Sequence, residues 1–407
     1  MKKVWDKWTR IALVKRILVG LILGAVLGIA VPQATGIAIL GDVFVSALKA
    51  IAPLLVFFLV ISSLCNAGKS HGGVIKTVII LYMFSTVLAA VIAVFASMAF
   101  PVKMTLANAA TDTSAPQGIV EVLNNLLLNV VANPVSSLVN ANYVGILMWA
   151  VLLGLAFRVA DKMTKKVLAD VADGISMVVT WIINLAPFGI FGLVFNTVST
   201  NGLDIFTTYG KLLLLLVGCM LFIYFVTNPL LVYWCIRQNP YPLIFQCLKR
   251  SALTAFFTRS SAANIPVNMK VCEEMGLDRD TYSVTIPLGA TINMDGAAIT
   301  ITVMTMATAF TLGIHVDIPT AIILSLLAAL SACGASGVAG GSLLLIPMAC
   351  SLFGISDDIS MQVVAVGFII GVVQDSVETA LNSSSDLLFN LAISTRSDAK
   401  IPLASSR

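Results

Sequence analysis

The sequence predicts an all-α polytopic membrane protein with eight transmembrane helices and two re-entrant helical hairpins arranged as inverted repeats. The first observation is composition. Hydrophobic residues make up 58% of the 407 residues and charged residues only 11%, against roughly 25% charged in an ordinary soluble domain. Apolar surface on this scale would associate in water. The composition and the small net charge of +4 therefore exclude a soluble enzyme, a disordered chain and a nucleic-acid-binding protein.

The second observation is a series of apolar runs long enough to cross a bilayer, which takes about 20 residues each. A basic segment, residues 1–16, precedes the first run at about 17–35. The run is too long for a signal peptide and ends at no small-residue cleavage site, so we expect a transmembrane helix with a cytoplasmic N-terminus. Further spans are expected at about 43–66, 77–100, 143–160, 174–200, 208–236, 283–312 and 359–393.

The third observation is that Lys and Arg alternate in density between successive connections. Residues 101–142 contain only Lys103, and residues 201–211 contain only Lys211. The denser connections are 67–76, 158–166, 237–250 and the C-terminal tail. The positive-inside rule then places both termini in the cytoplasm.

Two further apolar stretches do not fit as plain spans. Residues 242–276 and 319–353 are each two short apolar arms around a small, polar centre, at 258–266 and 334–342. Full crossings would disturb the alternation of charge, whereas re-entrant hairpins preserve it. Irregular backbone at membrane depth is tolerated where it faces a cavity or protein. Two hairpins, each followed by a long span, indicate the inverted repeats of a secondary transporter.

Acidic residues inside the spans mark the working part of the chain. Four lie well inside apolar runs, all after residue 290: Asp295, Asp375, Glu378 and Asp386. Burying a charge there costs at least about 2.5–3.5 kcal/mol. The spacing of Asp375, Glu378, Asn382 and Asp386 places them on one helical face within roughly 80°, with Thr379 beside them. This stripe favours a substrate or ion path over a structural polar seam.

The seventh span is interrupted at Asn293-Met294-Asp295-Gly296. An unwound turn frees carbonyl oxygens and Asp295 adds a carboxylate, which suits a hard cation such as sodium; a simple kink with a buried Asp is the alternative. No cluster of His, Cys and carboxylate has zinc-ligand spacing. Gly334-Ala335-Ser336-Gly337 matches an intramembrane serine-protease motif, but no histidine follows His315 to serve as the base.

These motifs resemble those of the dicarboxylate/amino acid:cation symporters, the glutamate-transporter homologues, over essentially the whole chain. The strongest are Thr258-Arg259-Ser260-Ser261, Asn293-Met294-Asp295-Gly296 and the series from Asp375 to Asp386. The resemblance implies that family's fold, a homotrimer in the bacterial inner membrane, and elevator-type movement. Residues 1–240 would be mainly scaffold and trimerisation helices, with spans 3 and 6 in the moving domain. Residues 241–393 would form the core transport domain and 394–407 a cytoplasmic tail.

The resemblance also implies the roles of individual residues, with sodium as coupling ion and no cofactor. Asp375 would bind the substrate ammonium and Asn382 its α-carboxylate. The whole substrate site would comprise Ser260, Ser261, Gly337, Asp375, Glu378, Thr379 and Asn382. One sodium site would use Asp386 with carbonyls near Gly289, Asn293 and Asn382. A second would use the Thr291 carbonyl and the second hairpin near Ala332 and Ala335. A third would use Asp295 and Asn293 with Ser85, Thr86 and the Tyr82 carbonyl.

One departure from the family pattern bears on the substrate. Members that take acidic substrates carry an arginine one turn after the ammonium-binding Asp, and here that position is Glu378. A glutamate repels the side-chain carboxylate that an arginine would bind. Within the family the chain is thus most similar to bacterial sodium-coupled importers of serine and threonine. The alternatives are a sodium- or proton-coupled symporter of acidic amino acids or C4-dicarboxylates, and a passive pore. Arg259 is expected to pair with Asp375 or Glu378 when the site is empty, so Glu378 is expected either to contact the substrate or to pair with Arg259.

Overall fold

The computed structural model describes residues 11, 13–66, 73–106, 128, 131–203, 205–333, 335 and 340–397. These residues form helices and connections, with no β-strand among them. The helices of the first half are α2 (Leu13–Ala30), η1 (Thr35–Ile37), α3 (Ala38–Asn66), α4 (Gly73–Ala99), α6 (Pro134–Val139), α7 (Tyr143–Ala156), η2 (Phe157–Val159), α8 (Lys162–Asn184) and α9 (Ala186–Asn201).

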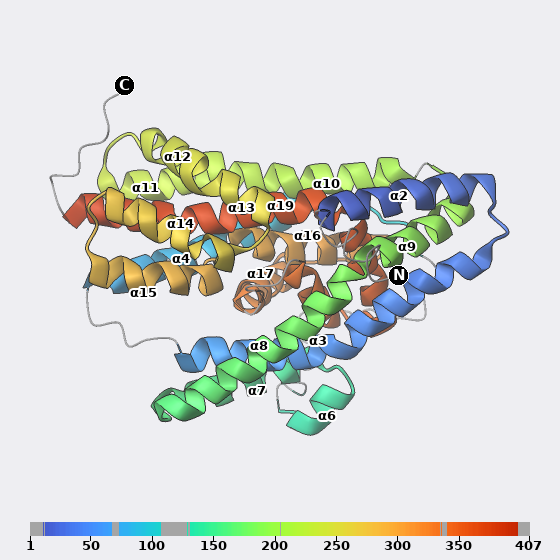
Figure 1. The fold of residues 1–407 in the computed structure, drawn as a ribbon, viewed down its shortest axis with the longest axis horizontal. Coiled ribbons are helices and arrows are strands. Elements are labelled where there is room, and N and C mark those ends of the chain that lie inside the picture. Colours follow the sequence, from blue (N-terminus) through green and yellow to red (C-terminus); the bar gives the residue numbers. More distant parts are fainter. Residues whose placement is uncertain are drawn as a thin grey trace.

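The helices of the second half surround one long helix, α19 (Asp357–Ser397), which has 41 residues. The others are α10 (Ile205–Phe222), η3 (Ile223–Thr227), α11 (Asn228–Ile236), α12 (Tyr241–Cys247), η4 (Leu248–Ala252), α13 (Leu253–Thr258), α14 (Ser261–Glu274), α15 (Arg279–Ile292), α16 (Asp295–Thr311), α17 (Ile318–Ala332), η5 (Gly341–Leu345) and α18 (Ile346–Ser351). Helices α4, α10, α11 and α13 to α16 all contact α19, as Figure 1 shows.

A second group of helices packs around α3, which contacts α7, α8 and α9. Helix α2 lies along α9 (Figure 1), and its facing residues Gly20, Gly24 and Gly28 recur every fourth position. A Cβ added at Gly24 would lie 2.6 Å from the carbonyl oxygen of Phe191. Small residues at such an interface let two helix backbones approach closely, so these glycines set the spacing of α2 and α9.

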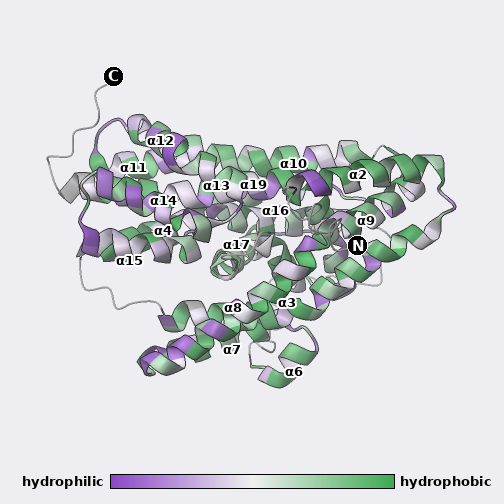
Figure 2. Cartoon of the chain, in the orientation of Figure 1, coloured by the Kyte–Doolittle hydropathy of each residue, from purple (hydrophilic) through white to green (hydrophobic). Residues whose placement is uncertain are grey.

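Six stretches of the described residues are long and apolar enough to cross a membrane, judged by length and composition. They are Thr35–Asn66, Gly73–Ala99, Lys162–Asn184, Ile205–Ile236, Arg279–Thr311 and Asp357–Ser394. In Figure 2 hydrophobic residues cover α2 and α10, while hydrophilic residues gather where α14 leads into α15 and at the far end of α8. The described residues therefore contain the several membrane-spanning helices of a multi-pass membrane protein.

Two expected spans have different boundaries. The span expected at 174–200 is two helices, α8 and α9, because Leu185 ends the first and Pro187 lies in the first turn of the second. Proline is tolerated there because the N–H it lacks has no partner within the helix. The span expected at 143–160 changes type near its end, since α7 ends at Ala156 and η2 continues the helix to Val159. A continuous apolar run thus conceals a helix boundary that proline sets.

The first hairpin is broken over fewer residues than its polar centre suggests. Only Arg259, with φ of 53°, and Ser260 lie between α13 and α14. The Ser260 hydroxyl accepts a hydrogen bond from the Ala263 N–H at 3.2 Å, which caps α14. The helix therefore resumes at Ser261, and Pro266 lies inside it.

The other two predicted interruptions are seen in the structure as well. Asn293 and Met294 separate α15 from α16, at the interruption predicted for the seventh span. In the second hairpin α17 ends at Ala332 and the chain is helical again from Gly341. Most of the hairpin's centre, including Gly337, lies outside the described residues.

An ion-pair cluster joins α3 to the start of α19. Lys49 Nζ lies 2.7 Å from Asp358 Oδ1 and 3.1 Å from Asp357 Oδ2. Lys49 thus links the α3 group of helices to the central helix α19 by ion pairs.

Asp317 caps α17, at the start of the second hairpin. The hydrogen bond from Thr320 holds the pKa of the Asp317 carboxyl below its ordinary value.

Candidate substrate and cation site

The polar stripe predicted on the last long span lies inside the protein. The exposed fractions of Asp375, Glu378, Thr379, Asn382 and Asp386 range from 1% to 6%. The stripe therefore faces the interior of the protein and not lipid, as a polar face of a membrane-spanning helix must. Buried charges require partners, and the partners of each residue show what the stripe can bind.

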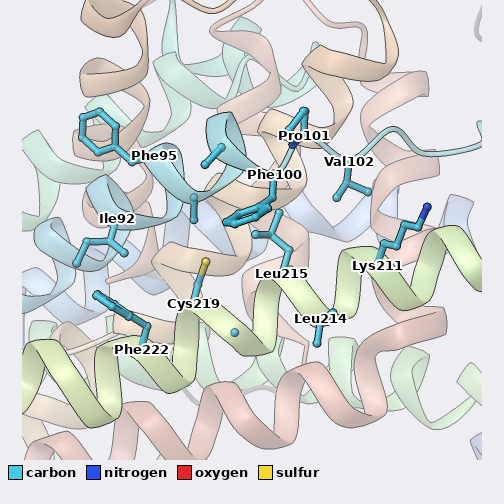
Figure 3. A pocket seen from close by; sticks show the side chains of 13 residues that line it. Ile92, Phe95, Phe100, Pro101, Val102, Lys211, Leu214, Leu215, Cys219 and Phe222 are labelled. Carbon is cyan, nitrogen blue, oxygen red and sulfur yellow. The ribbon is translucent and has the colours of Figure 1, made fainter.

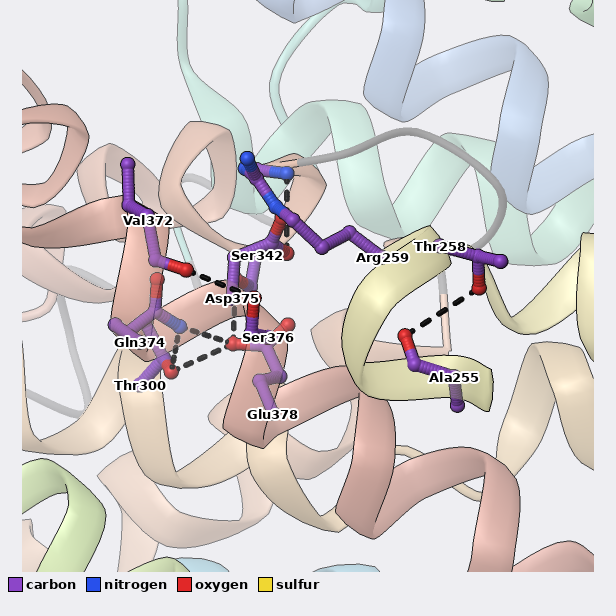
Figure 4. Close-up of polar contacts among 11 residues, drawn as sticks. Ala255, Thr258, Arg259, Thr300, Ser342, Val372, Gln374, Asp375, Ser376 and Glu378 are labelled. Atoms are coloured by element: carbon purple, nitrogen blue, oxygen red, sulfur yellow. Dashed lines mark hydrogen bonds and ion pairs between the residues drawn. The ribbon is translucent and has the colours of Figure 1, made fainter. Parts of the chain in front are cut away.

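Asp375 lies between the two hairpins. Its Oδ2 accepts a hydrogen bond from Arg259 Nε at 2.7 Å, an ion pair whose side chains are 5% and 11% exposed. Its Oδ1 accepts from the Gly340 N–H at 3.3 Å. Figure 4 shows Arg259 reaching Asp375 from the turn after α13. One carboxylate is therefore bound by both hairpins at once.

Glu378 lies one turn further along and has a different set of partners. Its Oε2 accepts hydrogen bonds from Thr300 Oγ1 at 2.7 Å, from Ser342 Oγ at 2.9 Å and from Gln374 Nε2, as Figure 4 shows. All three donors are neutral, and no described residue forms an ion pair with Glu378. Of the two partners expected for Arg259, the guanidinium therefore meets Asp375 and not Glu378.

Asn382, on α19, holds the break between α15 and α16 against that helix. Its Oδ1 accepts a hydrogen bond from the Gly296 N–H at 2.7 Å. A Cβ added at Gly296 would lie 2.9 Å from the Glu378 Cα, so this close approach requires glycine. The first turn of α16 thereby sits directly on the polar stripe.

Asp386 and Asn293 form a buried cluster with unused oxygen atoms. Asn293 Nδ2 donates to Asp386 Oδ1 at 2.9 Å and to Ser385 Oγ at 2.8 Å. Asp386 Oδ2 and Asn293 Oδ1 are buried without a hydrogen-bond partner among the described residues. A Cβ added at Gly289 would lie 2.6 Å from Asp386 Oδ1. The bare backbone and the unpaired oxygens fit an oxygen-liganded cation.

A second buried carboxylate, Asp295, meets α4. Ser85 Oγ donates to its Oδ2 at 2.7 Å and Thr86 Oγ1 to its Oδ1 at 3.2 Å. Thr86 Oγ1 also lies 3.0 Å from the Tyr82 carbonyl oxygen. The structure thus brings together the α4 and α16 residues expected at the third sodium site, and they supply only oxygen atoms.

The remaining predicted residues are less closely grouped. Thr291 Oγ1 donates to the Leu288 carbonyl at 2.7 Å, and Cys333 Sγ, next to Ala332, lies 3.8 Å from the Ile292 carbonyl. The second hairpin therefore touches the end of α15, where the second sodium site was expected. Ala335 is half-buried.

A family model described as the sodium:dicarboxylate symporter family matches residues 13–396 of the chain. The chain belongs to this family. Among curated proteins it is similar to the serine/threonine transporter SstT of Bifidobacterium adolescentis, with 59% identity over 390 residues, 96% of this chain and 91% of that protein. It is 55% identical over 390 residues to the SstT of Streptococcus thermophilus, covering 96% of this chain and 97% of that protein.

In this member of the family, several residues at the site were not found from the sequence. Gln374 and Thr300 surround Glu378, and Gln374 Nε2 donates to Thr300 Oγ1 at 2.7 Å. Gln374 stands four positions before Glu378, so its place on the stripe could have been predicted from helical spacing. Thr300 and Ser342 come from other elements and carry no such signal.

A second polar network in the symporter joins the first hairpin to α19. Asn264 Nδ2 donates to Ser383 Oγ at 2.8 Å and to Ser251 Oγ at 2.9 Å. Asn268 Nδ2 donates to the Ser383 carbonyl at 2.8 Å. Ser251 Oγ, on the first arm, also donates to the Ser383 carbonyl at 3.4 Å, so both arms of that hairpin are hydrogen-bonded to the helix that carries the stripe.

Proposed function

We propose that the chain imports serine and threonine by symport with sodium. Belonging to the symporter family supports coupled transport rather than catalysis, and relatives at 55% and 59% identity named serine/threonine transporters support the substrate. In this proposal Asp375 binds the substrate ammonium and Asn382 the α-carboxylate. Ser260, Ser261, Gly337 and Thr379 complete the substrate site.

The observation that carries the substrate class is the environment of Glu378. A second carboxylate on the substrate would need a cation, and the position that would supply it holds a buried glutamate with neutral donors. Glu378 therefore disfavours the alternative substrates, acidic amino acids and C4-dicarboxylates. A serine or threonine hydroxyl, by contrast, can donate a hydrogen bond that the Glu378 carboxylate accepts.

Sodium coupling is supported by the unpaired oxygens of Asp386 and Asn293 and by the oxygen cluster around Asp295. We assign one sodium ion to Asp386 with carbonyls near Gly289, Asn293 and Asn382, and one to Asp295. A third ion near Thr291, Ala332 and Ala335 follows the family pattern. Each sodium ion would bind buried oxygen atoms of the protein and so supply a partner that they lack. In this proposal, sodium binding and substrate binding strengthen each other.

The proposal includes an architecture. Eight spans and two re-entrant hairpins would form a homotrimer in the bacterial inner membrane, with both termini cytoplasmic. Residues 241–393 with spans 3 and 6 would move as an elevator against the scaffold. The broken helices at Asn293 and Arg259 support this part of the proposal, because interrupted helices are typical of such sites.

The test is uptake of labelled serine into vesicles that contain the full-length chain, with and without an inward sodium gradient. We expect accumulation above the external concentration only with the gradient, and inhibition by threonine but not by aspartate. Equilibration without accumulation would indicate a passive pore. Competition by aspartate or succinate at serine-like concentrations would favour the alternative substrates.

A further inference from the structure

An apolar groove lies between the end of α4 and α10. It has a volume of about 850 Å³, within the range of roughly 300–1,000 Å³ found for ligand sites. Figure 3 shows Phe95, Phe100 and Phe222 lining it. Leu214, on α10, is 74% exposed and also lines it. The groove is thus open along apolar side chains of two candidate membrane spans.

The length of the groove matches one leaflet of a bilayer. Its lining on α10 extends from Lys211 to Phe222, which at 1.5 Å per residue is about 17 Å. Half of a hydrocarbon core of about 30 Å is about 15 Å. A ligand that fills the groove would therefore reach from the depth of the lipid headgroups to the middle of the membrane.

Positive charge is confined to one end of the groove. Lys211 is the only charged residue in its lining, and Figure 3 shows Lys211 and Val102 at the same end. Lys103 follows Val102 in the chain. These two lysines are the only Lys or Arg residues in 101–142 and 201–211. Among the described residues neither has an ion-pair partner. Lys211 and the backbone at Val102, which leads into Lys103, therefore lie at the same end of the groove.

The floor of the groove has room for a ligand. A Cβ added at Gly218 would meet no heavy atom within 4 Å, although Gly218 lies mid-helix and lines the groove. Glycine is unfavourable in a helix and is not required here by close packing. The groove is therefore open at Gly218, beside Leu215 and Cys219.

We propose that this groove binds one acyl chain of an anionic membrane phospholipid, whose phosphate lies at Lys211 and Lys103. Burial of methylene groups supplies the affinity, and the two lysines supply the preference for an anionic headgroup. The lipid would bind in the leaflet next to the connections poor in Lys and Arg. Because α4 also carries Ser85 and Thr86, the lipid would brace a helix of the cation site against α10.

The test is native mass spectrometry of the full-length purified chain, titrated with phosphatidylglycerol or phosphatidylcholine of identical acyl chains. We expect phosphatidylglycerol to bind more tightly. Lys211→Ala should weaken phosphatidylglycerol about fivefold and leave phosphatidylcholine unchanged. Gly218→Leu fills the groove and should weaken both lipids by at least about tenfold.

The matched control is Gly210→Leu, on the same helix and outside the groove lining, where an added Cβ also meets nothing within 4 Å. It should bind both lipids as the parent does. Equal binding of the two lipids by the parent, or equal binding by the Gly218 and Gly210 variants, would overturn the proposal and indicate an unselective lipid coat.

A second measurement does not depend on the purified state. Phe222→Trp places a fluorophore in the groove lining, and phosphatidylglycerol with brominated acyl chains in reconstituted vesicles should quench its added emission. Gly218→Leu in the same background should remove most of that quenching. Quenching that persists undiminished would mean that bulk lipid, rather than a bound chain, contacts the helix.

Discussion

Arg259 Nε and Asp375 Oδ2 lie 2.7 Å apart at the meeting point of the two hairpins. The chain's own guanidinium therefore neutralises the carboxylate to which we assign the substrate ammonium. A substrate cation that takes this place has to displace Arg259 or share Asp375 with it. Removal of one member of a buried ion pair costs about 3–5 kcal/mol, so this contact gives the sharpest test of the substrate site.

Asp375→Asn should abolish serine uptake. The amide cannot neutralise the ammonium, and the loss corresponds to at least about a hundredfold in affinity. Serine binding to the purified chain, by calorimetry, measures the effect apart from turnover. Asp317→Asn is the control, because Asp317 caps α17 outside the site and asparagine caps equally well. Near-normal affinity in Asp375→Asn would show that another group binds the ammonium.

Asp295→Asn and Asp386→Asn should each raise the sodium concentration needed for half-maximal serine transport. Each removes one negative charge from a different proposed ion site. Because coupling between two ligands is reciprocal, serine should also bind less tightly at fixed sodium. Sodium titrations of uptake measure both effects, again with Asp317→Asn as control. If neither variant changes the sodium dependence, the two assignments are wrong.

Glu378→Gln and Glu378→Arg should change which amino acids compete with serine. Two like charges about 4 Å apart repel by roughly 4 kcal/mol at an effective dielectric constant near 20, nearly a thousandfold in affinity. The neutral variant should let aspartate compete weakly, and the arginine variant should favour aspartate over serine. Competition uptake measures both. Continued exclusion of aspartate with normal serine uptake would place the selectivity at other residues of the pocket.

Gly24→Leu should destabilise the protein by separating α2 from α9. The added side chain would meet the Phe191 carbonyl, and overpacking typically costs about 1–3 kcal/mol. The midpoint of thermal unfolding in detergent measures the loss. Gly174→Leu on α8 is the matched control, because a Cβ at that glycine meets nothing within 4 Å. Equal midpoints would mean that α2 is held mainly by other contacts.

Hydropathy and helical spacing predicted the parts of the fold that depend on local sequence. The break at Asn293-Met294 follows from residues that disfavour a helix, and the buried stripe on α19 follows from its three- and four-residue spacing. The division between α8 and α9 was not predicted, because the apolar run continues through it. Pro187 was the available signal.

Pairing between distant elements could not be predicted in the same way. Spacing placed Asp375 and Glu378 on one face but left open which of them meets Arg259. Their choice of partner depends on where the turn after α13 lies relative to α19, a tertiary arrangement. Thr300 and Ser342 similarly reach Glu378 only because α16 and the second hairpin fold against it.

Helix α19 is unbroken over 41 residues, so it behaves as one rod about 60 Å long. Asp375 and Asp386 therefore keep a fixed separation whenever the rod is displaced along its axis. The pairing of Lys49 with Asp357 and Asp358 at its first turn is different, because Lys49 belongs to α3. Sliding of α19 past α3 would separate these charges, so the ion pairs of Lys49 report the position of α19 relative to α3.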